Sequence, residues 1–198
     1  MLARAFSAAL QGIDAYLLTV EADIAGGLPL FTIVGLPDTA IQESRERVRA
    51  AIRNSGYRFP FDKRVTINLA PADVRKGGPS LDLPIAIGIL AAGGQIDTEG
   101  LDDWVFVGEL ALDGSVRPVS GVLPVVIAAR NVGKWKVAVP SANGREAAVV
   151  EEMQVYPVET LLDVIGLLVE PETRRPLDGE RLDDLLRRSA ETLDFVEA

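Results

Sequence analysis

Residues 67–92 read INLAPADVRKGGPSLDLPIAIGILAA, and the residue pattern changes within this stretch from that of a strand to that of a buried helix. The segment RVTINLAP (64–71) is typical of a strand. LPIAIGILAA (83–92) is apolar on nearly every side, which predicts a helix beneath or between other layers. The intervening GGPS predicts a sharp turn. Ser80 therefore stands either as a presented nucleophile or as a cap for the free N–H groups of the helix. Asp82, in the first helical turn, suits the positive end of the helix dipole.

Strand and helix patterns alternate on both sides of this stretch, which predicts an α/β (α+β) domain with one core over residues 1–169. A polar, proline-bounded linker and an amphipathic helix are expected over 170–198. Strands are expected at 3–10, 15–24, 29–36, 136–140 and 154–158, a hairpin at 104–119, and further helices at 39–55, 122–131, 144–152 and 160–169.

The composition excludes several kinds of chemistry. The 198 residues include no cysteine and no histidine, so disulfides and an imidazole base are excluded, and with them the usual zinc sites. Adjacent acidic residues such as Asp102 and Asp103 do not converge on one ion, so no metal site is predicted. No apolar run approaches the length of a membrane span and no signal peptide is recognised, so we expect a cytoplasmic protein without a membrane partner.

The charge is uneven along the chain. The net charge of −9 argues mildly against nucleic acid as a partner, yet residues 1–80 hold ten Lys or Arg against eight Asp or Glu. The helix at 39–55 is expected to bury Ile41, Ser44, Val48, Ala51 and Ile52, with Asp38 or Thr39 as its cap and a capping box between Thr39 and Gln42.

Three arginines fall four residues apart on a neighbouring face of that helix. Arg45, Arg49 and Arg53, together with Arg75 and Lys76, could form a basic face for DNA. The alternative is a solvated helix face or a subunit contact that pairs with acidic residues elsewhere. For this fragment alone we favour that alternative, because the basic surplus before residue 80 is only two charges, whereas a ring of six copies would repeat the patch around one channel.

Long strings at 34–52, 67–92 and 107–114 resemble, in the same order, the N-terminal domain of the magnesium-chelatase-like AAA+ ATPases, the family of the competence protein ComM and of YifB. The resemblance covers about residues 1–169. It implies the fold of the Lon protease proteolytic domain, related to domain 2 of ribosomal protein S5. The chain stops about where the family's ATPase module should begin, so we expect an excised N-terminal domain with its linker.

The resemblance also implies partners and cofactors. Full-length members resemble hexameric, ATP-driven motors, and ComM-type proteins are associated with DNA branch migration during the uptake of foreign DNA. The implied partners are the chain's own AAA+ module and sister subunits of a homo-hexamer, with DNA as a further candidate. ATP and Mg would belong to that absent module. No cofactor is expected here, because Gly133-Lys134 lacks the rest of a phosphate-binding loop. A role in a genuine magnesium chelatase is an alternative, but a Lon-like domain is not expected in such a subunit.

A Lon-type peptidase uses a Ser-Lys dyad, in which the lysine takes the proton of the serine. The family serine lies in a motif similar to KxGPSAG, which GGPSLD matches as far as Ser80. The family lysine lies in a motif similar to PIGGLK, and here PVSGVL (118–123) places Leu123 at that position. Leucine exchanges no proton, so the resemblance implies a silent peptidase site, with an active serine peptidase using Ser80 as the alternative. Of the four lysines, Lys76 is the nearest in sequence, and we expect it to point to solvent.

Overall fold

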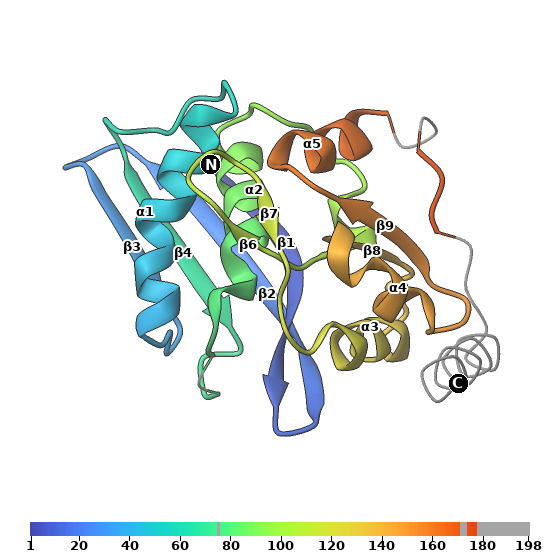
Figure 1. Cartoon of the computed structure of the whole chain (residues 1–198). Coiled ribbons are helices and arrows are strands. Elements are labelled where there is room, and N and C mark those ends of the chain that lie inside the picture. The colour runs from blue at the N-terminus through green and yellow to red at the C-terminus, as the bar shows by residue number, and fades with distance from the viewer. Residues whose placement is uncertain (75, 171–173, 178–198) are drawn as a thin grey trace, which may run out of the picture.

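The computed structural model describes residues 1–74, 76–170 and 174–177. A seven-stranded sheet runs through the molecule in the order β3-β4-β2-β1-β5-β8-β9 (Figure 1). Two of its pairings, β1 with β2 and β2 with β4, are antiparallel, and the other four are parallel. The fold class predicted from the sequence, mixed α/β, is confirmed. The strands are β1 (Leu2–Gln11), β2 (Asp14–Ala25), β3 (Leu30–Val34), β4 (Arg64–Ala70), β5 (Trp104–Phe106), β8 (Lys136–Pro140) and β9 (Gln154–Val158), with β6 (Glu109–Leu110) and β7 (Val116–Arg117) forming a separate small sheet.

The helices cover both faces of part of the sheet. They are α1 (Thr39–Asn54), α2 (Asp82–Ala92), α3 (Val122–Asn131), α4 (Gly144–Ala148) and α5 (Leu161–Val169). Residues of α1, α2 and α5 pack into one apolar cluster, whereas α3 and α4 pack into another. Successive side chains of β5 point to opposite faces of the sheet, so Trp104 and Phe106 pack into the first cluster and Val105 packs into the second.

Helix α2 is the centre of the first cluster, as its sequence predicts. Every residue from Asp82 to Ala92 is buried, and the helix packs against β1, β2 and α1. Burying a single Leu or Ile side chain stabilises the folded state by about 1.5–3 kcal/mol relative to leaving it exposed. Burial of this apolar run therefore strongly favours a central position for α2. Figure 1 shows α1 and α2 side by side on one face of the sheet, with α1 toward β3 and α2 against β1 and β2.

Helix α1 is amphipathic, and its buried residues are those expected: Ile41, Ser44, Val48, Ala51 and Ile52. Of the two predicted caps, Asp38 is the one used, because its Oδ1 accepts a hydrogen bond from the Ile41 N–H at 2.9 Å. The predicted capping box of Thr39 with Gln42 is wrong. The Gln42 side chain instead donates to the carbonyl of Ile33 on β3, at 3.4 Å.

Both outer strands of the sheet carry partners on their free edges. On β3, the carbonyls of Phe31 and Ile33 accept hydrogen bonds at 3.4 Å from the side chains of Arg45 and Gln42 on α1. On β9, the carbonyl of Val155 accepts a hydrogen bond at 2.8 Å from the Leu177 N–H. Side chains and a late segment of the chain therefore occupy groups that a further strand would need.

Several boundaries differ from those expected. Only 109–117 of the predicted hairpin forms β6 and β7, around Asp113-Gly114, where Gly114 adopts a φ of 90°. Trp104–Phe106 joins the main sheet instead. Helix α4 ends at Ala148, short of the predicted 152. The amphipathic helix expected near the end of the chain lies outside the described residues. Within the described part of the chain, no helix has the length and apolarity that crossing a bilayer requires.

Candidate functional site

Ser80 lies in a single 3₁₀ turn, Pro79–Leu81, that leads into α2. Its carbonyl accepts a hydrogen bond at 3.0 Å from the Gly108 N–H, and the Gly108 carbonyl accepts one at 3.1 Å from the Leu83 N–H. One of the free N–H groups in the first turn of α2, that of Leu83, is thus satisfied by the segment that precedes β6. The predicted capping role of Ser80 is wrong, because α2 begins without a side-chain cap.

A pocket of about 330 Å³ opens beside Ser80. Its wall combines Gly77 and Gly78, the end of β1, the chain just after β5, and the segment that leads into α3. Glu109 is the one titratable side chain in the wall, and it pairs with Arg117 at 3.5 Å. No hydrogen bond joins the Ser80 hydroxyl to any described side chain. The lining residues are Ala8, Leu10, Gly77, Gly78, Ser80, Val107, Glu109, Pro118, Val119, Ser120 and Val125.

Leu123, the position of the missing base, is half-buried on α3 against the second apolar cluster. Its N–H donates to Glu146 Oε1 at 3.1 Å. None of the four lysines lines the Ser80 pocket. Lys134 donates to the carbonyl of Asp102, and Lys136 lies 3.7 Å from Asp103. A proton acceptor of the Lon type is therefore absent from the described surroundings of Ser80.

Lys76 contradicts the expectation that it points to solvent. Its side chain is fully buried, and the ammonium donates to the carbonyl of Pro71. Burial lowers the pKa of Lys76 below its ordinary value. A buried ammonium presents no charge to a phosphate, so Lys76 cannot contribute to a basic face in this conformation. Arg75, the other predicted member from this turn, lies outside the described residues.

A buried ion pair behind the Ser80 turn was missed by sequence reasoning. Asp82 is fully buried, and its Oδ2 lies 2.6 Å from Arg47 Nε, while Arg47 Nη2 lies 3.1 Å from Oδ1. The Ser44 hydroxyl and the Leu110 N–H also donate to this carboxylate. Asp82 thereby joins α1, α2 and β6. The sequence had predicted only a favourable interaction of its charge with the helix dipole.

Burial raises the pKa of Asp82, and the hydrogen bonds from Arg47 and Ser44 oppose that rise. The hydrogen bond to Asp82 in turn raises the pKa of Arg47. Asp38 reinforces the same region, because one carboxylate oxygen caps α1 and the other accepts from the Gly78 N–H at 3.0 Å. The Ser80 turn is thus fixed to α1 at two points.

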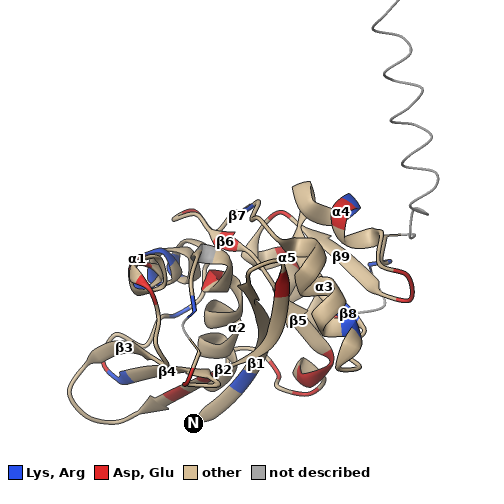
Figure 2. Ribbon diagram, turned by 90° about the horizontal axis from the view of Figure 1, so that it is seen from below, with Lys and Arg blue, Asp and Glu red and all other residues tan. Residues whose placement is uncertain are grey.

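The predicted arginine face is partly engaged in structural contacts. Arg45 donates to the carbonyls of Gln42 and Phe31 at 3.0 and 3.4 Å. Arg49 pairs with Glu46 at 3.2 Å, and its guanidinium lies 5.3–6.0 Å from the ring centroids of three phenylalanines. Arg53 is exposed near the end of the helix. Figure 2 shows the basic residues of α1 at the end of the molecule that carries β3 and β4.

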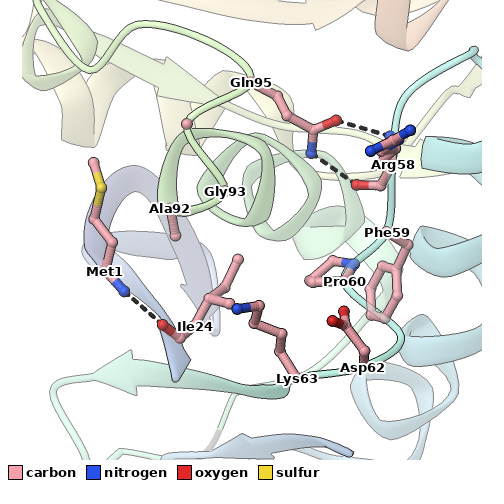
Figure 3. Close-up of a pocket in the computed structure, with 11 residues that line it drawn as sticks. Met1, Ile24, Arg58, Phe59, Pro60, Asp62, Lys63, Ala92, Gly93 and Gln95 are labelled. Atoms are coloured by element: carbon pink, nitrogen blue, oxygen red, sulfur yellow. Dashed lines mark hydrogen bonds between the residues drawn. The ribbon is translucent and has the colours of Figure 1, made fainter. Parts of the chain in front are cut away.

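Two adjoining pockets occupy that end. A pocket of about 330 Å³ lies between α1 and the 58–63 loop, lined by Pro29, Leu30, Phe31, Arg45, Arg49, Phe59, Pro60, Phe61 and Lys63. A larger pocket, of about 610 Å³, shares Phe59, Pro60 and Lys63 with it and extends to the end of α2. Figure 3 shows the Lys63 side chain reaching into this larger pocket toward Ile24. The Gln95 amide supports the loop through two hydrogen bonds to the Arg58 backbone, at 2.8 and 2.7 Å.

The described residues do not fit a nucleotide site of the phosphate-loop kind. Gly133-Lys134 lies between α3 and β8, and the Lys134 ammonium sits 3.5 Å from the Phe6 ring centroid while it donates to a backbone carbonyl. Nor do three or more acidic side chains gather for a metal ion anywhere in the described ranges.

Comparisons with known proteins bear on the whole domain. The family model described as subunit ChlI of Mg-chelatase matches residues 20–143. Competence protein ComM of Haemophilus influenzae is 45% identical over 167 residues, which are 84% of this chain and 32% of that protein. YifB of Escherichia coli is 46% identical over 181 residues, 91% of this chain and 35% of that protein. A Lon protease of Salinispora arenicola is 27% identical over 188 residues, 88% and 23% of the two chains. The chain spans about a third of the length of ComM and YifB.

Proposed function

The chain belongs to the family of the Mg-chelatase subunit ChlI, together with ComM and YifB, and from that membership we propose that it is a non-catalytic domain of an AAA+ ATPase. Its role is to help assemble the subunits of a hexameric motor and to contact DNA. Because ComM is named as a competence protein, DNA branch migration during natural transformation is the process we propose for the parent protein.

The observation that carries the non-catalytic assignment is the environment of Ser80. A Ser-Lys peptidase needs a lysine of lowered pKa within hydrogen-bonding distance of the serine hydroxyl. Leu123 occupies the family position of that lysine, and no lysine lines the pocket beside Ser80. Lys76 does have a lowered pKa, but its ammonium is bound to the Pro71 carbonyl. These contacts support a fold that keeps the serine turn without its base.

A peptidase assay tests this assignment against the alternative of a Lon-type serine peptidase. We expect no turnover of casein or of a fluorogenic peptide by the 198-residue chain, and the same null result for Ser80→Ala. Leu123→Lys places an ammonium at the family position and provides the matched comparison. Turnover by the native sequence that disappears in Ser80→Ala would refute a non-catalytic role.

The motor is proposed for the longer parent protein. ATP and Mg would bind its AAA+ module, and the partners of this domain would be that module and sister subunits. Sedimentation of the parent protein with and without ATP tests this assembly, and we expect a hexamer when ATP is bound. A parent protein that stays monomeric with ATP and Mg would contradict it.

The DNA contact is proposed for the basic face of α1. Fluorescence anisotropy with labelled DNA at low and high salt measures the contact, because each phosphate neutralised adds to the salt dependence. We expect changing Arg45, Arg49 and Arg53 together to Ala to weaken binding and flatten the salt slope. Unaltered affinity and slope would mean that this face is not the contact.

A further inference from the structure

Phe61 is an exposed aromatic ring set among cations. The ring is 52% exposed and rests on Phe59, with 5.1 Å between ring centroids and a tilt of 58°. Phe59 is buried and rests in turn on Phe31 at 5.3 Å. Two buried rings thus support an exposed one. Such an arrangement holds a flat apolar face in the smaller pocket beside α1.

Three cations line the same pocket as this ring. The Arg49 guanidinium lies 5.8 Å from the Phe61 ring centroid, and its Nε is buried without a hydrogen-bond partner. Arg45 and Lys63 complete the lining, whereas the wall of this pocket contains no acidic residue. On a chain with a net charge of −9, this is an unusual surface. Its charge is complementary to an anionic ligand, and its ring to a flat one.

The site continues beyond one ring. The larger pocket shares the loop residues Phe59, Pro60 and Lys63 with the smaller pocket, and the Lys63 ammonium reaches into it (Figure 3). Its wall also contains Asp62, so of the two pockets only the smaller lacks an acidic residue. A ligand that follows both pockets passes an aromatic face and then a cation. An extended polyanion with flat groups has this alternation, whereas a single small anion would use only one pocket.

We propose that the two pockets beside α1 bind single-stranded nucleic acid, with one unpaired base stacked on Phe61 and the flanking phosphates held by Arg45 and Lys63. The inference rests on the proposed DNA contact of this domain. It specifies that the ligand is a single strand with an unpaired base. Base faces in a duplex are covered by their neighbours, so a ring in a recess can stack only on an unpaired base. An acidic peptide would satisfy the cations but would leave the ring without a flat partner.

The test is the binding of a fluorescent oligothymidylate to the 198-residue chain, measured by anisotropy at low salt. We expect Phe61→Ala to weaken binding by about tenfold, the size of one lost base stack. Phe61→Leu, which keeps an apolar side chain without a π face, should weaken it by a similar factor. An oligonucleotide of the same length with abasic sites isolates the phosphate contacts, and on this probe we expect both variants to bind like the native chain.

Trp135→Ala is the matched control, because Trp135 is another exposed aromatic beside lysines, in a pocket that also contains Asp102, Asp103 and Glu152. We expect it to bind like the native chain. Binding that is unchanged in both Phe61 variants, or reduced equally on the abasic probe, overturns the stacking site and leaves a phosphate contact standing. No binding of any oligonucleotide overturns the proposed DNA contact as well. Binding of poly-glutamate that depends on Phe61 overturns the proposal in favour of an acidic protein partner.

Discussion

The pocket beside Ser80 and the pocket beside Phe61 have about the same volume but opposite characters. The first has a serine in the setting of a nucleophile, with glycines in its wall and two helices fixed behind it. It lacks a base. The second has no reactive group, yet its cations and exposed ring are complementary to a ligand. The comparison shows that a motif indicates chemistry only when its partners are also present.

The two pockets also differ in how their arginines are used. Arg47 and Arg49 stand two residues apart on α1, but Arg47 turns inward to Asp82 behind the Ser80 turn and Arg49 lies across the phenylalanines. The first arginine holds the domain together, and the second lines a surface. Variants at each pocket can therefore separate structural roles from binding roles.

Removal of Asp82 should have the largest effect. Asp82→Ala leaves Arg47 partly buried without its partner, and breaking such a pair costs about 3–5 kcal/mol in the free energy of unfolding. Urea denaturation followed by circular dichroism measures the change. Asp103→Ala is the control, because its side chain is 66% exposed in a weak surface pair, and it should change stability by less than about 0.5 kcal/mol. Equal effects of the two would mean that the buried pair does not hold the Ser80 turn.

Arg49→Met should have an intermediate effect. The substitution keeps an unbranched apolar stem but removes the cation above three rings, for which we expect a loss of about 1 kcal/mol in the free energy of unfolding. The same urea titration measures it, with Arg53→Met as the matched control on the exposed end of α1. A loss as large with Arg53→Met would show that helix charge, and not the aromatic contact, accounts for the effect.

Lys76→Met should have the smallest effect at neutral pH, below about 1 kcal/mol, because the lost hydrogen bond to Pro71 opposes the relief of a buried charge. The substitution should instead be detected in how the free energy of unfolding depends on pH. Burial lowers the folded-state pKa of Lys76, so between that pKa and the ordinary value of 10.5 the unfolded chain binds more protons than the folded one. The native chain should therefore gain stability as pH rises through this window.

The gain should be absent in Lys76→Met. Comparing thermal unfolding of the two chains at a series of alkaline pH values isolates the lysine, since every other group titrates in both. Parallel curves would contradict a lowered pKa for this residue.

The sequence predicted the fold well in segments where apolar residues recur at helical spacing or run continuously. The buried face of α1 and the all-apolar α2 could be read directly, because helical spacing and continuous apolarity depend only on local order. The resemblance to ComM and YifB was likewise correct. What the local pattern could not supply was the partner of each polar residue, which lies far along the chain.

Ser80, Lys76 and Asp82 illustrate this limit. A cap at Ser80 was a sound local prediction, but Gly108 satisfies that end of α2 from 28 residues away. Lys76 was expected in water because its neighbours are turn residues, and no local signal indicated the Pro71 carbonyl as its partner. The placement of Asp82 beside Arg47 could be proposed only by setting the buried faces of two helices against each other.

The stabilised outer strands restrict how copies of the domain can meet. Arg45 and Gln42 occupy carbonyls on β3, and Leu177 pairs with β9, so neither side of the sheet offers a run of vacant acceptors to a second copy. A ring built from this domain would then have to join through helices and loops. In the ring proposed for the parent protein, subunits would then meet through side chains, and not through the backbone hydrogen bonds of a continuous sheet.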